Sequence, residues 1–314
     1  MKHRLSTVWA ACVFASLACS LANAASAAQK DEDFALWEVA PGIFVHQGQH
    51  VGVEDPRRGD SANIGFIVGK DCVAVIDTGG SLATGRALLA ALRRTTRVPL
   101  CFVINTHAHF DHVLGNPVFA AQDGVRFVGH HLLPAALAES EGFFRQQFQP
   151  ETVGAPEPMF VQEGLWVEGE GSLDLGGRVL QLKAEPQAHS AADLTVFDAQ
   201  TSTLWSGDLL FVDRMPVLDG NLRGWLKWLA MADGQTIARV VPGHGPAAAP
   251  WPQALAPERA YLQSLQDEAG TAVQAGEFLE DVTARGHEHP PAGWLVTGPH
   301  GRNLGRAFRE LEWN

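Results

Sequence analysis

Short apolar runs alternate with helical patterns along the first half of the chain. Residues 66–68 and 72–76 are apolar and are separated by Gly69-Lys70-Asp71, which predicts a β-hairpin. Ser81 follows as an N-cap for a helix with leucines on one face, and the apolar run 100–105 predicts the next strand. Strands with intervening helices predict an α/β fold built from layers of sheet and helix.

The second half repeats this alternation and then changes character. Apolar runs predict strands at residues 179–184, 194–197, 204–206 and 239–241. After Gly245 the pattern becomes helical, with one amphipathic helix that starts at Pro257 and another over 303–313. We therefore expect an α/β domain over 34–250 and a helical extension over 251–314 that packs on the same domain.

Four potential metal ligands follow the strand at 100–105, in the run His107-Ala108-His109-Phe110-Asp111-His112. A strand would alternate these side chains between two faces and a helix would spread them around its circumference, so only a tight loop can bring them to one point. A lone His-x-His is more often a solvated turn. Here further candidate ligands follow, each just beyond a predicted strand, at His189, Asp208 and His244. Imidazoles combined with carboxylates favour zinc or a similar cation.

The order of these motifs resembles the metallo-β-lactamase-fold hydrolase superfamily. The motifs are His-x-His-x-Asp-His at 107–112, a single His189, Ser-Gly-Asp at 206–208 and Gly-His-Gly at 243–245. The resemblance covers residues 42–244 and implies a four-layer αββα sandwich that holds two zinc ions, with iron or manganese as other metals. It implies a first zinc on His107, His109 and His189, a second on Asp111, His112 and His244, and Asp208 as the bridge between them.

The resemblance also implies the chemistry. Two cations that share a carboxylate and a water can lower the pKa of that water toward neutrality, so a hydroxide nucleophile arises without a catalytic Ser or Cys. We expect Asp111 and Asp208 to orient this nucleophile or to accept protons. Asp77 directly follows a buried strand, and in the resembled family this position orders the His loop by hydrogen bonds.

Differences from other branches of the superfamily narrow the range of reactions that we expect. Its diiron members typically have Glu where this chain has His109, and its true β-lactamases have Cys or Ser where this chain has Asp208. The chain is therefore more similar to thioesterases of the glyoxalase II type, lactonases and esterases, which act on small molecules. Three alternatives stay open: a persulfide dioxygenase-like iron enzyme, class B β-lactamase activity, and a non-catalytic zinc-binding accessory protein.

Two further stretches, 60–69 and 213–226, resemble a periplasmic subgroup, the quinoprotein relay system zinc metallohydrolases, which are SoxH-like. This resemblance implies an accessory role beside a quinoprotein dehydrogenase. The segment from Asp213 to Trp228 follows Asp208 and predicts a substrate-facing wall that contains Arg214, Trp225 and Trp228. The alternative is a linker whose tryptophans pack beneath a helix. Arg214 would then bind a substrate carboxylate or form a salt bridge with Asp213 or Asp219.

The N-terminus predicts export. Lys2, His3 and Arg4 precede an apolar run over 5–22, which ends in the small-residue cleavage motif Ala22-Asn23-Ala24. We expect a signal peptide over 1–24, with Ala27 as a second cleavage position, and a mature protein in the periplasm or outside the cell. No second membrane candidate appears, so stable membrane insertion is not expected after cleavage.

Charge and cysteine content add two constraints on the mature chain. The formal net charge of −12 becomes −14 when Lys2 and Arg4 leave, because 21 basic residues then face 35 acidic ones. Such a surface repels phosphate backbones, so nucleic acid is not an expected partner. Cys72 and Cys101 remain as the only pair in an oxidising compartment. They form either a disulfide or two small buried apolar side chains.

Overall fold

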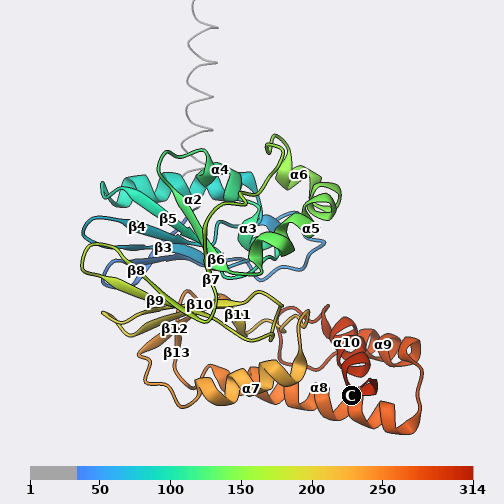
Figure 1. Cartoon of the computed structure of the whole chain (residues 1–314). Helices are drawn as coiled ribbons and strands as arrows, with labels where there is room; N and C mark the ends of the chain where they lie inside the picture. The colour runs from blue at the N-terminus through green and yellow to red at the C-terminus, as the bar shows by residue number, and fades with distance from the viewer. Residues whose placement is uncertain (1–33, 314) are drawn as a thin grey trace, which may run out of the picture. The chain divides into compact units, whose positions relative to one another are not determined.

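The computed structural model describes residues 34–313. The chain divides into a short N-terminal unit, Met1–Ala35, and one compact unit, Leu36–Asn314. The predicted signal peptide lies outside the described residues. Within the compact unit two β-sheets face each other, and helices cover the outer face of each sheet (Figure 1). This arrangement confirms the predicted four-layer αββα fold.

The first sheet has seven strands, antiparallel from β1 to β4 and parallel from β4 to β7. Their bounds, in spatial order, are β1 (Trp37–Ala40), β2 (Ile43–His46), β3 (Ile64–Val68), β4 (Val73–Ile76), β5 (Leu100–Ile104), β6 (Arg126–His130) and β7 (Leu165–Val167). The predicted hairpin is β3 and β4. The outer face of this sheet carries α2 (Leu82–Thr95) and α4 (Asn116–Ala120) (Figure 1).

The second sheet has six strands, and its only parallel pair is β11 with β12. In spatial order they are β13 (Ala249–Pro250), β12 (Arg239–His244), β11 (Thr203–Phe211), β10 (Leu194–Asp198), β9 (Val179–Ala184) and β8 (Glu170–Asp174). Its outer face carries α7 (Leu222–Ala232) and α8 (Leu255–Ala275) (Figure 1). The remaining helices are α3 (Phe110–Val113), α5 (Leu133–Gln147), α6 (Gln149–Thr152), α9 (Leu279–Glu288) and α10 (His300–Glu312), with a short 3-10 turn at Arg58–Asp60.

The apolar positions that predicted the strands form the core between the sheets. Ile76 and Ile104 of the first sheet and Val196 and Trp205 of the second belong to one buried cluster. Inward-facing residues of two packed sheets bury each other, which stabilises the sandwich and leaves the strand ends free to carry polar side chains. The predicted cap also forms, since the Ser81 hydroxyl accepts from the backbone N–H of Thr84 at 3.0 Å.

Two candidate ligands lie within strands, which corrects the prediction that each follows a strand end. Asp208 lies inside β11 and His244 is the last residue of β12. The pairing of β11 with β12 is irregular on both sides of Gly207, which has a φ of 51°. A Cβ on Gly207 would lie 2.6 Å from the side chain of Thr106, so glycine allows this close approach. The irregular backbone keeps β11 paired with β12 and turns the side chain of Asp208 toward the His loop.

The C-terminal helices are more extensive than the apolar pattern predicted. Helix α8 starts two residues before Pro257, and α10 starts three residues before the predicted position 303. Helix α9 was not predicted, because Val282 is its only buried apolar side chain. These helices share a buried cluster with α7 and β11, so they belong to the same compact unit. Within the described residues, no helix has the length and apolarity needed to cross a bilayer.

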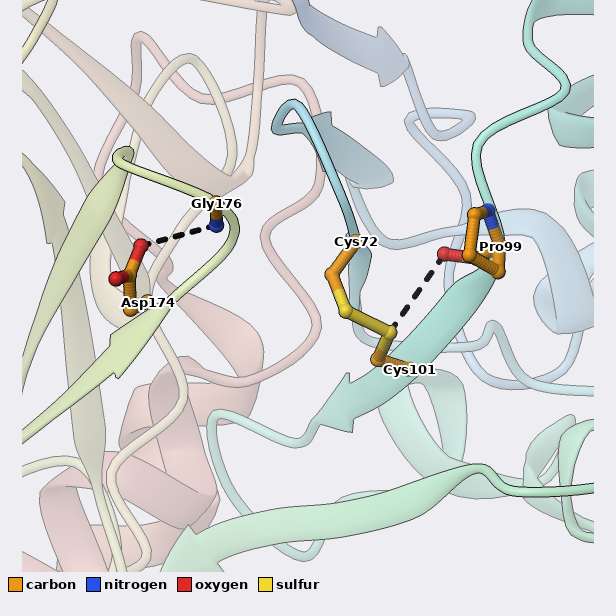
Figure 2. The surroundings of a disulfide bond; sticks show 5 residues. All are labelled: Cys72, Pro99, Cys101, Asp174 and Gly176. Atoms are coloured by element: carbon orange, nitrogen blue, oxygen red, sulfur yellow. Dashed lines mark hydrogen bonds between the residues drawn. A yellow bond between two sulfur atoms is a disulfide. The ribbon is translucent and has the colours of Figure 1, made fainter.

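Cys72 and Cys101 form a disulfide with a Cα–Cα distance of 5.6 Å (Figure 2). The bond joins the residue before β4 to the start of the parallel neighbour β5. The backbone N–H of Cys72 donates to Leu175 in the β8–β9 turn, so the bond lies where the two sheets meet. Of the two alternatives for these cysteines, the structure selects the disulfide.

Removal of this disulfide is expected to lower the free energy of unfolding by about 2–4 kcal/mol, because the bond closes a loop across a sequence separation of 29 and restricts the unfolded chain. Urea unfolding of the wild type with and without reductant measures the loss. The double variant Cys72→Ser and Cys101→Ser serves as the control, since reductant should not affect it. Equal stability of the oxidised and reduced wild type would contradict the prediction.

Candidate metal centre

The His loop is positioned by the end of β5 and the first turn of α3. β5 ends at Ile104, His107 lies in the loop that follows, and His109 is the N-cap residue of α3. Asp111 and His112 lie within α3 itself. This corrects the prediction of a tight loop alone, because a helical turn carries Asp111 and His112, and the four side chains divide between two neighbouring groups.

The first group of candidate ligands consists of His107, His109, His189 and Asp208, whose ligand atoms all lie within 4.8 Å of one another. The Nε2 atoms of His107 and His189 lie 3.6 and 3.5 Å from Asp208 Oδ2. His109 faces the group through Nδ1, which is 3.0 Å from Nε2 of His189. Three imidazoles and one carboxylate in this arrangement match the chemistry of a zinc site.

The second group consists of Asp111, His112 and His244, again within 4.8 Å of one another. Asp208 lies between the two groups, with Oδ1 3.1 Å from His112 Nε2 and Oδ2 3.3 Å from His244 Nε2. His244 Nε2 is also 3.4 Å from Asp111 Oδ2. The structure thus brings all the sequence-predicted ligands together, and Asp208 is the residue that contacts both groups.

Three of these ligand atoms are buried and make no hydrogen bond of suitable geometry with the described residues: His107 Nε2, His112 Nε2 and Asp208 Oδ1, although the last two lie 3.1 Å apart. Buried polar atoms in native proteins almost always have a partner. Divalent cations held by the residues of the two groups would supply partners for these atoms, so the residues present fit a metal pair.

Three of the ligands have protonation states that suit metal binding. Burial lowers the pKa of His107 well below its usual range, and the neighbouring His112 lowers it further. Burial lowers the pKa of His189 to about 3. Neutral imidazole is the form that binds a metal. Burial would raise the pKa of Asp208, but His244 and His112 hold it well below its usual range, so the carboxylate is ionised. Burial would lower the pKa of His112, but the carboxylates of Asp208 and Asp77 raise it well above its usual range, so its proton must leave when a metal binds.

Asp77 lies behind the His loop, as predicted, and is 1% exposed. Its carboxylate accepts from the backbone N–H and the hydroxyl of Thr106 and from Nδ1 of His112, each at 2.8 Å. A carboxylate on the far nitrogen of a ligand histidine fixes the tautomer and the orientation of the ring. The contacts suit the predicted orienting role.

Sequence reasoning missed three residues that are distant in sequence from the ligands they contact from outside. The Ser61 hydroxyl donates to Asp111 Oδ2 at 2.8 Å, and the Ser61 carbonyl accepts from His244 Nδ1. The Val217 carbonyl accepts from His189 Nδ1 at 2.7 Å, and Asp219 Oδ2 lies 3.0 Å from His109 Nε2. All three residues lie in the stretches 60–69 and 213–226, so their only sequence signal was the subgroup resemblance.

The predicted substrate wall is only partly available to a substrate. Trp225 is fully buried, its indole N–H donates to the Leu209 carbonyl, and its ring lies 5.3 Å from that of His189. Trp228 is 7% exposed within the same core cluster. The wall prediction is therefore wrong for the tryptophans, because the amphipathic helix α7 buries its apolar face against β11. Trp225 supports His189 from behind.

Arg214 differs from the tryptophans. It is 8% exposed, and its Nε and Nη1 atoms are buried with no partner among the described residues. It forms neither of the salt bridges considered from the sequence, since Asp219 instead pairs with His109 and Arg302. Burial would raise the pKa of Asp111, but the neighbouring His112 and His244 lower it. The charge of Arg214 lowers it further. Arg214 is thus a largely buried cation with unpaired hydrogen-bond donors, and its charge acts on Asp111 of the second ligand group.

Residues 57–244 match the family model of the metallo-β-lactamase superfamily. Among solved structures, a metallo-β-lactamase from Pontibacter korlensis aligns with a TM-score of 0.59 and 19% identity, over 73% of this chain and 98% of that one. A metallo-β-lactamase from Hirschia baltica aligns with a TM-score of 0.56 and 20% identity, over 73% and 96%. At these identities the likeness concerns the fold.

A structure of the sec-alkyl sulfatase PisA1 aligns over more of the chain, with a TM-score of 0.65 and 16% identity over 91% of this chain and 52% of that one. That match leaves less than a tenth of the chain unaligned, so it extends into the C-terminal helices. A 2,3-bisphosphoglycerate-independent phosphoglycerate mutase from Synechococcus elongatus is 31% identical over 115 residues. That match covers 32% of this chain and 22% of the mutase, so the chain spans about a fifth of that relative's length. Because the family model spans more than half of the chain and includes every candidate ligand, the chain belongs to the metallo-β-lactamase superfamily of metal-dependent hydrolases.

Proposed function

We propose that this protein is a dinuclear zinc hydrolase that cleaves an ester, thioester, lactone or amide bond in a small molecule. The observation that carries the proposal is the pair of ligand groups that Asp208 contacts together, with three buried ligand atoms that make no hydrogen bond within the described residues. An ionised Asp208 between two sets of histidines is a suitable bridge for two cations. Iron and manganese accept many of the same ligands, so the metal is part of the test.

The residues of the site have separate tasks in this reaction. Bound cations would lower the pKa of a shared water toward neutrality and polarise the scissile carbonyl. Asp208 keeps the two ligand groups at a fixed separation. The Ser61 hydroxyl fixes Asp111 through Oδ2, which orients this carboxylate to accept a proton during turnover. No Ser or Cys nucleophile is required.

The substrate is proposed to carry an anionic group, which Arg214 binds. A buried guanidinium without a partner is unfavourable by several kcal/mol, and a substrate carboxylate would supply the missing acceptors. Arg214 lies close enough to Asp111 to influence its pKa, so the anionic group would be held beside the second ligand group. Acidic esters, thioesters and lactones are therefore the first substrates to test.

Arg214→Gln is expected to raise KM for an anionic substrate by about 10- to 100-fold, the equivalent of a charged hydrogen bond of about 1.5–3 kcal/mol, with little change in kcat. Neutral esters of the same size should be unaffected, because they do not use the guanidinium. Steady-state kinetics on matched acid and neutral esters measure both parameters. Arg223→Gln, at an exposed position of α7, is the control. An equal effect on both substrate types would refute the anionic subsite.

The central experiment is a hydrolysis panel on purified mature protein with measured metal content. Two zinc ions per chain and turnover of thioesters, lactones or aryl esters would support the proposal. Two tightly bound zinc ions without any turnover would favour the accessory protein. One iron per chain with oxygen consumption would favour the persulfide dioxygenase-like alternative. Rapid cephalosporin turnover with inert esters and thioesters would favour class B β-lactamase activity.

Export and a link to a quinoprotein dehydrogenase are also proposals. Export rests on the leader motif, and an N-terminal sequence of the exported protein that begins at Ala25 or Ala28 would support it. The quinoprotein link rests on the stretches 60–69 and 213–226. Both stretches contain residues that contact candidate ligands, namely Ser61, Val217 and Asp219, so the metal site alone accounts for part of that resemblance.

A further inference from the structure

A short segment, Pro216–Asp219, lies against two of the three histidines of the first ligand group. The Val217 carbonyl accepts from His189 Nδ1 at 2.7 Å, and the backbone N–H of Asp219 donates to the His189 carbonyl at 3.1 Å. The side chain of Asp219 lies 3.0 Å from His109 Nε2. One segment therefore contacts the nitrogens of His109 and His189 that point away from the ligand group.

The opposite side of this segment is held by α10. Asn303 is fully buried; its side-chain oxygen accepts from the N–H of Leu218 at 2.9 Å and its amide donates to the Pro216 carbonyl at 2.7 Å. Arg306 donates to the Asp219 carbonyl at 2.7 Å. Arg302 forms a salt bridge with the Asp219 carboxylate. Helix α10 thus supplies hydrogen-bond partners for the backbone of the segment and a cation for the carboxylate of Asp219.

Asn303 also ties α10 to the rest of the helical region. Its amide donates to the hydroxyl of Tyr261 on α8, at 2.9 Å. Nearby, the backbone N–H of Met215 donates to the Val296 carbonyl, and that of Leu295 donates to the Asp213 carbonyl. The chain that leads into α10 therefore pairs with the residues just before the segment Pro216–Asp219. Helix α10 is therefore anchored independently of the ligand group.

We infer that α10 is a positioning element of the metal centre: it fixes Pro216–Asp219 so that Asp219 and Val217 hold His109 and His189 in the orientations that ligate metal. This inference rests on the proposed metal binding. A carbonyl at Nδ1 of His189 leaves its Nε2 free for the metal, and a carboxylate at Nε2 of His109 leaves its Nδ1 free. These are the two atoms that face each other across the first group.

If α10 only covered the hydrophobic core, this role would explain its apolar face but not its polar contacts. Leu304 and Phe308 are buried in the helical core cluster, as a cover requires. Arg302 and Arg306 are also engaged within the protein by Asp219, which leaves them less available for a substrate. Arg309 is exposed on the same helix without a described polar contact, so it provides a matched control.

The test measures metal binding by Asp219→Asn, Arg302→Gln, Arg302→Lys and the control Arg309→Gln. Asp219→Asn keeps the shape of the side chain and is expected to weaken one of the two zinc ions by about 10- to 100-fold, as loss of a hydrogen-bonded carboxylate behind a ligand typically does. Arg302→Gln should give a smaller loss that Arg302→Lys restores, and Arg309→Gln should match the wild type. Chelator competition gives the affinities, and the absorption of the cobalt-substituted protein reports the ligand geometry.

Thermal unfolding of the metal-free variants separates positioning from folding, since positioning predicts unchanged metal-free stability together with altered affinity and cobalt absorption. The inference is overturned if Asp219→Asn and Arg302→Gln bind two zinc ions with wild-type affinity and a wild-type cobalt spectrum. It is also overturned if their zinc affinity falls only in proportion to a lower metal-free stability. A wild type that binds no metal would overturn the proposed function as well, so the two failures are distinguishable.

Discussion

Asp208→Ala is expected to reduce kcat by about a thousandfold or more and to lower the zinc content below two ions per chain. Asp208 contacts both ligand groups, so its loss removes the common ligand and the negative charge between them. Metal-assisted charge stabilisation contributes several kcal/mol to a transition state, and each 1.36 kcal/mol corresponds to a factor of ten in rate. Metal analysis and steady-state kinetics on the same preparation measure the two effects.

The control for this variant is Asp233→Ala, which removes a half-exposed carboxylate that pairs with Arg259 at the surface. This change should leave kcat and zinc content at wild-type values. Full activity of Asp208→Ala with two bound zinc ions would refute the bridging role. A loss of activity with both zinc ions retained would place Asp208 in proton transfer instead.

Asp77→Ala is expected to lower the free energy of unfolding by about 3–5 kcal/mol and to weaken zinc binding by about 10- to 100-fold. The substitution leaves three buried donors without their acceptor, namely the N–H and hydroxyl of Thr106 and Nδ1 of His112. Each unsatisfied buried group costs about 1–3 kcal/mol. Urea unfolding of the metal-free protein and chelator competition measure the two losses separately.

Asp77→Asn provides the matched variant, because the amide keeps the shape and one acceptor oxygen but presents N–H groups where Thr106 and His112 donate. We expect its stability and its zinc affinity to lie between those of the wild type and Asp77→Ala. Unchanged stability and affinity in Asp77→Ala would show that the His loop holds its geometry without this carboxylate.

Most of the candidate ligands were predictable because they lie in short motifs that follow or end an apolar strand, whereas Asp208 lies inside β11. His107, His109, Asp111 and His112 are close in sequence, so a short loop and one helical turn are enough to bring them together. Assignment of the distant His189 and His244 to particular groups came from the family resemblance. Their placement in the structure agrees with it.

The outer contacts of the ligands were not predictable in the same way. Ser61, Val217 and Asp219 act through distant pairs, and two of these contacts use backbone carbonyls, which every residue possesses. No spacing rule links residue 61 to residue 244 or residue 109 to residue 219. Such pairs are known only when the strands and loops that carry them are placed in space.

The stretch after Asp208 illustrates the same limit. Its sequence left Arg214 and the tryptophans with two interpretations each, a substrate wall or ordinary packing and pairing. The structure buries Trp225 against His189, while it leaves Arg214 without an internal partner. Helix α7 itself was not predicted, and only the tertiary structure shows which neighbours its apolar face contacts.

Local chemistry and periodicity were sufficient for the α/β class, the β3–β4 hairpin, the Ser81 cap and the candidate ligands of the His loop, because these depend on residues close in sequence. Tertiary structure alone decided the Cys72–Cys101 bond, the place of Asp208 within an irregular strand, and the contact of α10 with the segment behind His109 and His189. Each of these depends on the relative position of segments far apart in the chain. Packing of the complete core sets that position, and no single segment encodes it.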